Sequence, residues 1–311
     1  MKGVSQHILL FKCIDQIMKP ISKKLLFVFL CSYCFISKAQ IPDDEKNALL
    51  SLFTATKGPQ WNIQWDLSQP VTEWYGVKIK ENHVVGIELG RNNLTGILPK
   101  EISNLKKLEI LNLSLNNLKG NFPKELLSLV ELKEISLEMN NFKNQIPAAI
   151  SQLQRLEILS LYNNAFTGVI PESLGSIKNL KVINLSGNYL EGTIPLSFGG
   201  LCNLEVLGLF GNKLSGVIAL NFDKLPKLYE ITLAYNKFYG PVPEGIDVLG
   251  DLKYLQLQGN NFNSFDSLKN INKERLITLN TDSLALQKGA DLFELEVVPE
   301  ANTKGEELIL E

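Results

Sequence analysis

Apolar residues in the middle of the chain alternate as they do in a β-strand with one buried face, and the alternation restarts at a fixed interval. In LSLNNLKGNFP (113–123), the leucines alternate at first, but Asn116 then stands where a buried apolar residue would be expected. The same segment occurs eight times, with a period of 24 residues and no insertion. The asparagines are Asn92, Asn116, Asn140, Asn164, Asn188, Asn212, Asn236 and Asn260.

A fixed period of this length with the pattern L-x-x-L-x-L-x-x-N is the signature of a solenoid repeat. We expect the short strands of successive repeats to lie side by side in a parallel sheet. The chain must then turn after each strand, which buries backbone groups that no strand can satisfy. An asparagine amide both donates and accepts, so an inward ladder of asparagines would satisfy these groups. Each asparagine should contribute about 1–3 kcal/mol, and Asn164→Ala should destabilise more than Asn163→Ala.

Glycine and proline recur in the second half of each repeat. Glycine suits a turn with positive φ, and Asn144 replaces it with the next most tolerant residue. Ala219 interrupts the proline series, and Ser264 and Ser267 replace glycine and proline where the array ends. The regular positions are glycines 96, 120, 168, 192, 216 and 240 and prolines 99, 123, 147, 171, 195 and 243.

The L-x-G-x-I-P form, as in PESLGSIKNLKVINLSGNYLEGTIP (171–195), resembles the plant-type leucine-rich repeat family over residues 43–266. The resemblance implies an α/β-type repeat solenoid, a right-handed horseshoe. Its parallel β-sheet would form the concave face, and turns and 3-10 segments the convex face. It also implies a module that binds a protein or a glycan. We place the eight repeats at residues 83–266.

Residues 40–82 should form an N-terminal cap, because a solenoid must shield its terminal core. Asp43 or Asp44 is expected to cap a helix that buries Ala48, Leu49, Leu52 and Phe53 on one face. Trp61, Trp65 and Trp74 follow, and we interpret them as packing residues.

The segment TEWYGVKI resembles the plant cap, in which cysteines flank W-x-G-V. Here those positions hold Thr72 and Ile79, which is similar to the disulfide-free secreted versions of Bacteroidetes-like bacteria.

Residues 1–39 read as a secretory signal peptide, with Lys23 and Lys24 before a short apolar core and Ser37-Lys38-Ala39 before the cleavage point. Met18 begins a better signal than Met1, so residues 1–17 are predicted to be untranslated. The first 39 residues hold six lysines and one acid, so the remainder carries a net charge of −7 rather than the −2 of the whole chain. We therefore expect an extracellular or cell-surface protein with no nucleic-acid partner and no stable membrane insertion after cleavage.

Residues 267–311 depart from the repeat and read as a degenerate C-terminal cap with a polar, acidic tail. ERLITLN (274–280) could supply one last strand and LFELEVV (292–298) another. The sequence alone leaves open whether the chain is truncated after this tail.

Little in the predicted mature chain points to catalysis. Its single histidine, His83, is placed in a surface turn, and its single cysteine, Cys202, is expected to be a packed or surface residue. The run Asp43-Asp44-Glu45 is better explained by the positive end of a helix than by a metal. We predict a monomer that is not an enzyme and has no cofactor or metal.

Positions between the inward leucines should face solvent on the concave side. They are mildly acidic in the early repeats and aromatic later, a composition typical of recognition surfaces. The main hypothesis is a secreted recognition module that binds protein or glycan. The alternatives are an inhibitor of a secreted hydrolase, a carbohydrate-processing enzyme or an ice-binding protein. The candidate ligand-binding residues are Glu134, Glu138, Tyr162, Phe210, Tyr235 and Tyr254.

Overall fold

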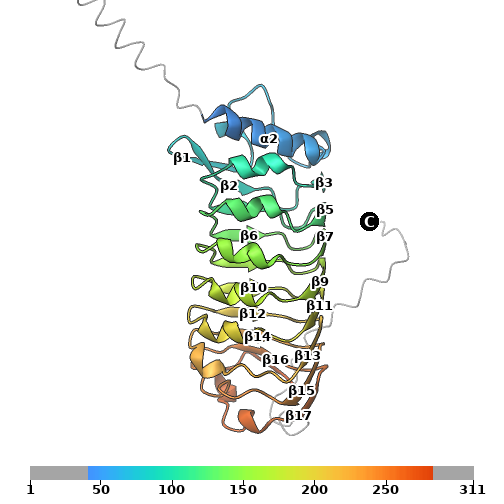
Figure 1. The fold of residues 1–311 in the computed structure, drawn as a ribbon, viewed down its shortest axis with the longest axis vertical. Helices are drawn as coiled ribbons and strands as arrows, with labels where there is room; N and C mark the ends of the chain where they lie inside the picture. Colours follow the sequence, from blue (N-terminus) through green and yellow to red (C-terminus); the bar gives the residue numbers. More distant parts are fainter. Residues whose placement is uncertain (1–40, 283–311) are drawn as a thin grey trace, which may run out of the picture.

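The computed structural model describes residues 41–282, in which 24-residue coils stack into an elongated solenoid (Figure 1). Helix α2 (Asp43–Ala55) lies at one end of the stack and strand β18 (Thr278–Asn280) near the other. The predicted signal peptide, the strand proposed at residues 292–298 and the acidic tail lie outside the described residues. The leucine-rich-repeat solenoid predicted from the sequence is confirmed.

The concave sheet has ten strands, in the order β1-β2-β4-β6-β8-β10-β12-β14-β16-β18. All neighbours are parallel except β1 and β2, which form an antiparallel hairpin. Partners lie one repeat apart, as Leu111 opposite Ile135 illustrates. The strands are β1 (Val77–Lys80), β2 (His83–Glu88), β4 (Ile110–Asn112), β6 (Glu134–Ser136), β8 (Ile158–Ser160), β10 (Val182–Asn184), β12 (Val206–Gly208), β14 (Glu230–Thr232), β16 (Tyr254–Gln256) and β18.

A second sheet, which the sequence analysis did not anticipate, runs along one edge of the stack (Figure 1). Its strands follow the ladder asparagines, and its eight members are paired in the order β17-β15-β13-β11-β9-β7-β5-β3. They are β3 (Thr95–Gly96), β5 (Asn117–Asn121), β7 (Asn141–Asn144), β9 (Ala165–Val169), β11 (Tyr189–Gly192), β13 (Lys213–Gly216), β15 (Lys237–Pro241) and β17 (Asn261–Ser264).

Short 3-10 helices complete the coils on the convex side. Prolines 99, 123, 147, 171 and 195 each precede one of them in extended conformation, which suits a residue with a fixed φ and no N–H donor. Where Ala219 breaks the series, the Asn221 side chain caps η8 by accepting from the Asp223 N–H. The 3-10 helices are η1 (Gly58–Gln60), η2 (Val71–Glu73), η3 (Lys100–Asn104), η4 (Lys124–Ser128), η5 (Ala148–Gln152), η6 (Glu172–Ser176), η7 (Leu196–Gly200), η8 (Phe222–Lys224), η9 (Asp266–Leu268) and η10 (Lys273–Arg275).

The asparagines form a continuous ladder through the core. Asn164 Nδ2 donates to the carbonyl oxygens of Leu161 and Tyr162 in its own coil, at 3.1 and 3.3 Å, and of Leu137 in the preceding coil, at 3.0 Å. Its Oδ1 accepts from the Phe142 N–H at 3.0 Å. From Asn116 on, each amide bonds backbone carbonyls that are buried in the exit turn of its own coil and links that coil to the previous one. Asn92, the first, bonds Ile63 of the cap instead.

A continuous apolar core surrounds this ladder. The inward strand residues, such as Ile87, Leu89 and Leu111, have no exposed surface. Aromatic side chains extend the core next to the second sheet, where Phe142 and Phe166 of adjacent coils stack with ring centroids 6.4 Å apart. Because each coil buries its apolar side only against its neighbours, the array behaves as a one-dimensional stack.

The N-terminal cap differs in one respect from expectation. Neither Asp43 nor Asp44 is the N-cap of α2, because the helix begins after Pro42 and has no side-chain cap. Proline already supplies the extended conformation that a helix entry requires. The acidic run instead occupies the first turn, where Asp44 accepts from the N–H of Glu45 at 3.0 Å.

The three tryptophans form one buried aromatic cluster. Trp65 stacks on Trp74 at 4.7 Å and meets Trp61 edge-on at 4.9 Å. Each indole N–H has a carbonyl partner, so these large side chains bury their apolar surface without leaving a donor unsatisfied.

The concave sheet has two strands more than the eight repeats account for. β18 confirms the strand expected within residues 274–280, while β1 comes from the cap and was missed. The turn between β1 and β2 consists of Glu81 and Asn82, both with positive φ, as a two-residue hairpin requires. His83 therefore begins β2, and the prediction that it lies in the turn was wrong.

Candidate ligand-binding face

The concave face consists of the outward side chains of the ten-stranded sheet and of the turns by which the chain leaves each strand. Side chains alternate in a strand, so the leucines point inward and the residues between them point outward. Of the candidate residues, Glu134 and Tyr254 lie in strands β6 and β16. Glu138, Tyr162, Phe210 and Tyr235 lie in the exit turns of four different coils.

The structure gathers these candidates into two groups. In the earlier coils, Glu134 and Glu138 lie near each other, and Tyr162 follows Glu138 at the same position of the next coil. In the later coils, the rings of Phe210 and Tyr235 meet edge-on at 5.1 Å. Tyr254 belongs to neither group, because it pairs in register with Glu230 on the neighbouring strand.

Electrostatics distinguishes the acidic group from the rest of the face. Burial raises the pKa of the Glu138 carboxyl, and the nearby charge of Glu134 raises it further. The Glu138 Oε2 atom is buried and has no hydrogen-bond partner within residues 41–282. Burial also raises the pKa of Tyr162, and Glu138 adds to the effect. A hydrogen-bond donor or a cation on a ligand would therefore stabilise the ionised form of the Glu138 carboxyl.

The aromatic group is the more exposed part of the face. Phe210 and Tyr235 keep 38% and 50% of their surface exposed, although both are large and apolar. Tyr229, with 37% exposed, lies at the entry to β14 and was missed by sequence reasoning, which considered only positions inside the strands and turns. Its pKa is raised by burial first and then by the charge of Glu230.

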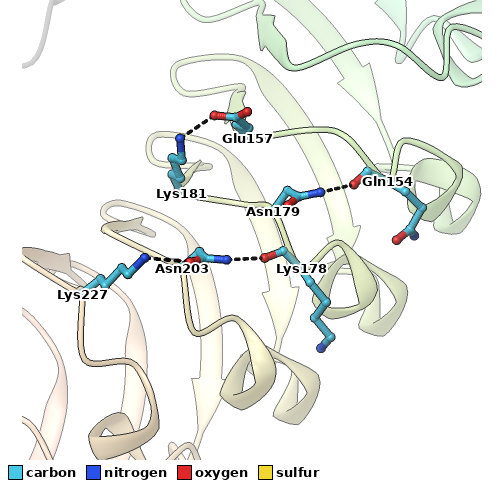
Figure 2. Close-up of polar contacts among 7 residues, drawn as sticks. All are labelled: Gln154, Glu157, Lys178, Asn179, Lys181, Asn203 and Lys227. Atoms are coloured by element: carbon cyan, nitrogen blue, oxygen red, sulfur yellow. Dashed lines mark hydrogen bonds and ion pairs between the residues drawn. The ribbon is translucent and has the colours of Figure 1, made fainter.

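A second ladder of polar contacts, also missed, runs along the edge where the chain enters the concave strands (Figure 2). Lys181 Nζ pairs with Glu157 at 2.6 Å, and the Asn179 amide donates to the Gln154 carbonyl at 2.8 Å. The signal in the sequence is the alternation of opposite charges at the repeat period, because residues 109, 133, 157 and 181 are Glu, Lys, Glu and Lys. These contacts join neighbouring coils and hold the sheet in register.

His83, at the start of β2, is partly exposed and binds the cap. Its Nδ1 lies 2.6 Å from Oε1 of Glu45, whose other oxygen accepts from the Val84 N–H at 2.7 Å. The Glu45 side chain is only 4% exposed, so a buried carboxylate of α2 ties the cap to strand β2. This contact joins residues 38 apart, and no local pattern could have revealed it.

Few groups in the described part of the chain suit catalysis. Cys202 is exposed and forms no disulfide there. Residues 41–282 hold no group of three or more His, Cys, Asp or Glu that could bind a metal ion. In the same range, no helix is long and apolar enough to cross a membrane.

Comparison with known proteins agrees with this architecture. The leucine rich repeat family matches residues 131–190, 154–214 and 179–238. The PEPR1-AtPEP1 crystal structure is 32% identical with a TM-score of 0.66, and the match covers 76% of this chain and 34% of that chain. The plant peptide hormone receptor RGFR1 in complex with RGF2 is 31% identical with a TM-score of 0.51, over 57% of this chain and 32% of that chain.

A plant ice-binding protein is 24% identical with a TM-score of 0.50, over 72% of this chain and 88% of that chain, and this likeness shows the fold alone. The chain spans about one third of the two receptor structures. Together, the repeat matches and these neighbours support a plant-type leucine-rich-repeat family.

Proposed function

We propose that this chain is a secreted, non-catalytic recognition module that binds a protein ligand through its concave face. The observation that carries the proposal is the exposed pair of Phe210 and Tyr235. Two large rings that hold each other in place keep 38% and 50% of their surface exposed. Aromatic anchors of this kind dominate protein interfaces, since they offer much contact area for little conformational entropy.

The receptor neighbours support a protein ligand. RGFR1 is a peptide hormone receptor whose structure holds RGF2, and the PEPR1 structure is that of PEPR1-AtPEP1. This chain corresponds to only a third of either receptor, so we carry over ligand recognition and no further activity. The acidic group at Glu134 and Glu138 adds a second contact chemistry to the same face.

We further propose that the protein is a bacterial, disulfide-free version in which the tryptophan cluster holds the cap. The support is that Thr72 and Ile79 stand where plant caps carry cysteines, while Trp65 and Trp74 stack nearby. Secretion is tested by expressing the chain with its leader and sequencing the exported product. A mature N-terminus at Gln40 is expected, and retention of residues 1–39 would contradict export.

The binding proposal is tested with a phage-displayed library of random linear peptides selected on the full chain. Affinities of the enriched peptides are then measured for the wild type and for the double variant Tyr162→Ala/Phe210→Ala. The control is Leu196→Ala/Val248→Ala, which removes two exposed apolar side chains outside the concave strands and their exit turns. We expect at least about tenfold weaker binding by the concave variant and unchanged binding by the control.

Each other outcome points away from the proposal. Peptides that bind both variants equally would move the site off the concave face. Selection of no peptide, together with binding to a polysaccharide panel, would replace protein with glycan as the ligand. Turnover of a polysaccharide, inhibition of a secreted hydrolase or thermal hysteresis would favour the corresponding alternative function.

A further inference from the structure

The residue that immediately precedes each ladder asparagine adopts a left-handed backbone conformation in all eight coils, with φ between 51° and 69°. We call these eight positions the rim. The repeat favours this conformation, because at seven of the eight positions the rim N–H donates to a backbone carbonyl of the next coil, as Met139 does to Tyr162 at 2.9 Å. Four rim positions hold the residues that tolerate left-handed backbone best, Asn163, Gly187, Gly211 and Gly259.

The other four rim positions hold Arg91, Leu115, Met139 and Tyr235, which are bulky residues in a strained conformation. Two of these side chains gain little burial in return, because Met139 is 40% exposed and Tyr235 is 50% exposed, whereas Leu115 is half-buried. Burial therefore does not explain why the coils of Met139 and Tyr235 lack the Asn or Gly used elsewhere. Strain retained without a structural gain is typical of functional positions.

The strained side chains lie beside the two groups of the concave face. Leu115 and Met139 occupy neighbouring coils, and Met139 directly follows Glu138, whose buried Oε2 has no partner within residues 41–282. Tyr235 packs on Phe210. Between these two places the rim holds only the small residues Asn163, Gly187 and Gly211.

The distance between Met139 and Tyr235, together with the charges beside them, indicates the length and the charge of the ligand. Met139 and Tyr235 are four coils apart, which is about 19 Å at the usual strand separation, a span that about six residues of extended polypeptide cover. Glu134 and Glu138 supply negative charge beside Met139, whereas Arg91 is the one cation among the rim residues. A partner with a lysine or arginine between apolar side chains complements this arrangement.

We propose that Leu115, Met139 and Tyr235 are specificity-determining contact residues that, with Glu134 and Glu138, bind an extended polypeptide segment carrying apolar side chains and a basic one. This inference rests on the proposed function, because it requires a protein ligand on the concave face. It assigns that ligand a direction along the stack of coils and a chemistry. It also explains three of the four unfavourable rim residues, which are Leu115, Met139 and Tyr235.

The test uses the peptides selected on the full chain, with Leu115→Asn/Met139→Asn and Tyr235→Asn as rim variants. Asparagine is chosen because the chain itself places Asn163 at a rim position with φ of 51°. Selected peptides should be enriched in Lys or Arg together with apolar residues. Both rim variants should bind them at least about tenfold more weakly. The melting temperature of Leu115→Asn/Met139→Asn should not fall, and Asn163→Gly should change neither property.

The outcomes separate this inference from the function on which it rests. If the rim variants keep full affinity while Tyr162→Ala/Phe210→Ala loses it, the concave face binds the ligand but the rim assignment is wrong. A lower melting temperature of the Leu115/Met139 variant would show that the rim side chains are structural. Selected peptides that lack basic residues would overturn the assigned chemistry. If no peptide is selected, the proposed function itself fails.

Discussion

At the scale of single residues, the repeat assigns polar side chains to positions where backbone groups need partners. The exit turn of every coil leaves carbonyl and amide groups in an apolar core, and one asparagine serves its own coil and the one before it. The same turn requires left-handed backbone at the rim. A bulky residue such as Met139 in this backbone conformation destabilises the folded state by about 1–3 kcal/mol. Its presence there is therefore better explained by function than by stability.

Removing one ladder amide should show its contribution. Asn164→Ala deletes two amide N–H donors, shared among three carbonyl oxygens, and one acceptor in the core, so we expect a loss of about 1–3 kcal/mol in the free energy of unfolding. Chemical denaturation monitored by circular dichroism measures it. The matched control is Asn163→Gly, because Asn163 has φ of 51° and alanine there would add strain of its own. Equal stability of the two variants would contradict a stabilising ladder.

The raised pKa of Glu138 predicts a pH dependence of stability. Burial disfavours its charged form in the folded state, so the folded protein holds this proton more tightly than the unfolded chain does. The favourable contribution is complete below the ordinary carboxyl pKa of 4.5 and is lost as pH rises through the higher folded pKa. The melting temperature of Glu138→Gln should therefore exceed that of the wild type more at pH 7 than at pH 4.

The surface variant Glu191→Gln provides the control for this comparison, since that residue is exposed on β11. It should show no comparable gain between pH 4 and pH 7. If Glu138→Gln gains nothing at pH 7, its carboxylate is not penalised by burial.

At the scale of elements, the coils are joined by contacts one repeat apart, and the cap is joined to the first coil by a contact between distant segments. The Glu157–Lys181 pair (Figure 2) involves side chains that are 37% and 47% exposed, so water screens the attraction and the pair should contribute little to stability. The buried Glu45 is different, because it holds both His83 and the backbone of Val84. The cap therefore depends on one carboxylate more than on any surface pair.

Loss of the histidine should loosen the cap without unfolding the array. His83→Ala leaves Glu45 buried with one partner fewer, and we expect a loss of about 1–3 kcal/mol, moderated because His83 is partly exposed. Hydrogen exchange should accelerate across α2 and β1 and stay unchanged in β10 to β14. The exposed Lys80→Ala on β1 is the control. Uniform acceleration along the whole chain would contradict a local role.

At the scale of the whole molecule, the coils in the middle of the solenoid are more deeply buried than the last coil at its C-terminal end. Each coil contacts only its neighbours, so stability is close to a sum of coil and interface contributions. Asn164 is buried and donates three hydrogen bonds, whereas Asn260 in the last full repeat is half-buried and donates two. The same substitution should therefore have unequal effects along the stack.

Comparison of Asn164→Ala with Asn260→Ala tests this difference. The central variant should lose more free energy of unfolding, because Asn164 is more buried than Asn260 and its amide contacts more carbonyl oxygens. The terminal variant should mainly accelerate hydrogen exchange in β16 to β18. Equal losses, or equal exchange profiles, would indicate that the array unfolds as one unit regardless of position.

The sequence by itself determined the solenoid. A strict period fixes which residues face inward, and from the second repeat on the ladder and concave-sheet contacts join residues of the same or adjacent repeats. The period also predicts backbone conformation at single positions. Asn144 replaces the glycine of most other repeats, and it adopts the positive φ expected there, 67°. The positions of Phe210 and Tyr235 just before the ladder asparagines of their coils also follow from the period, although both residues lie in exit turns rather than in strands.

Only the tertiary structure decided what depends on long-range packing and on backbone conformation. The pairing of Glu45 with His83 and the hairpin that adds β1 join the cap to the array, and the cap has no period to extrapolate. The second sheet requires the turn segments of neighbouring coils to come within hydrogen-bonding distance, which side-chain pattern does not encode. The strain at Leu115 and Met139 emerged only from φ values, because a leucine or methionine in a sequence gives no sign of left-handed backbone.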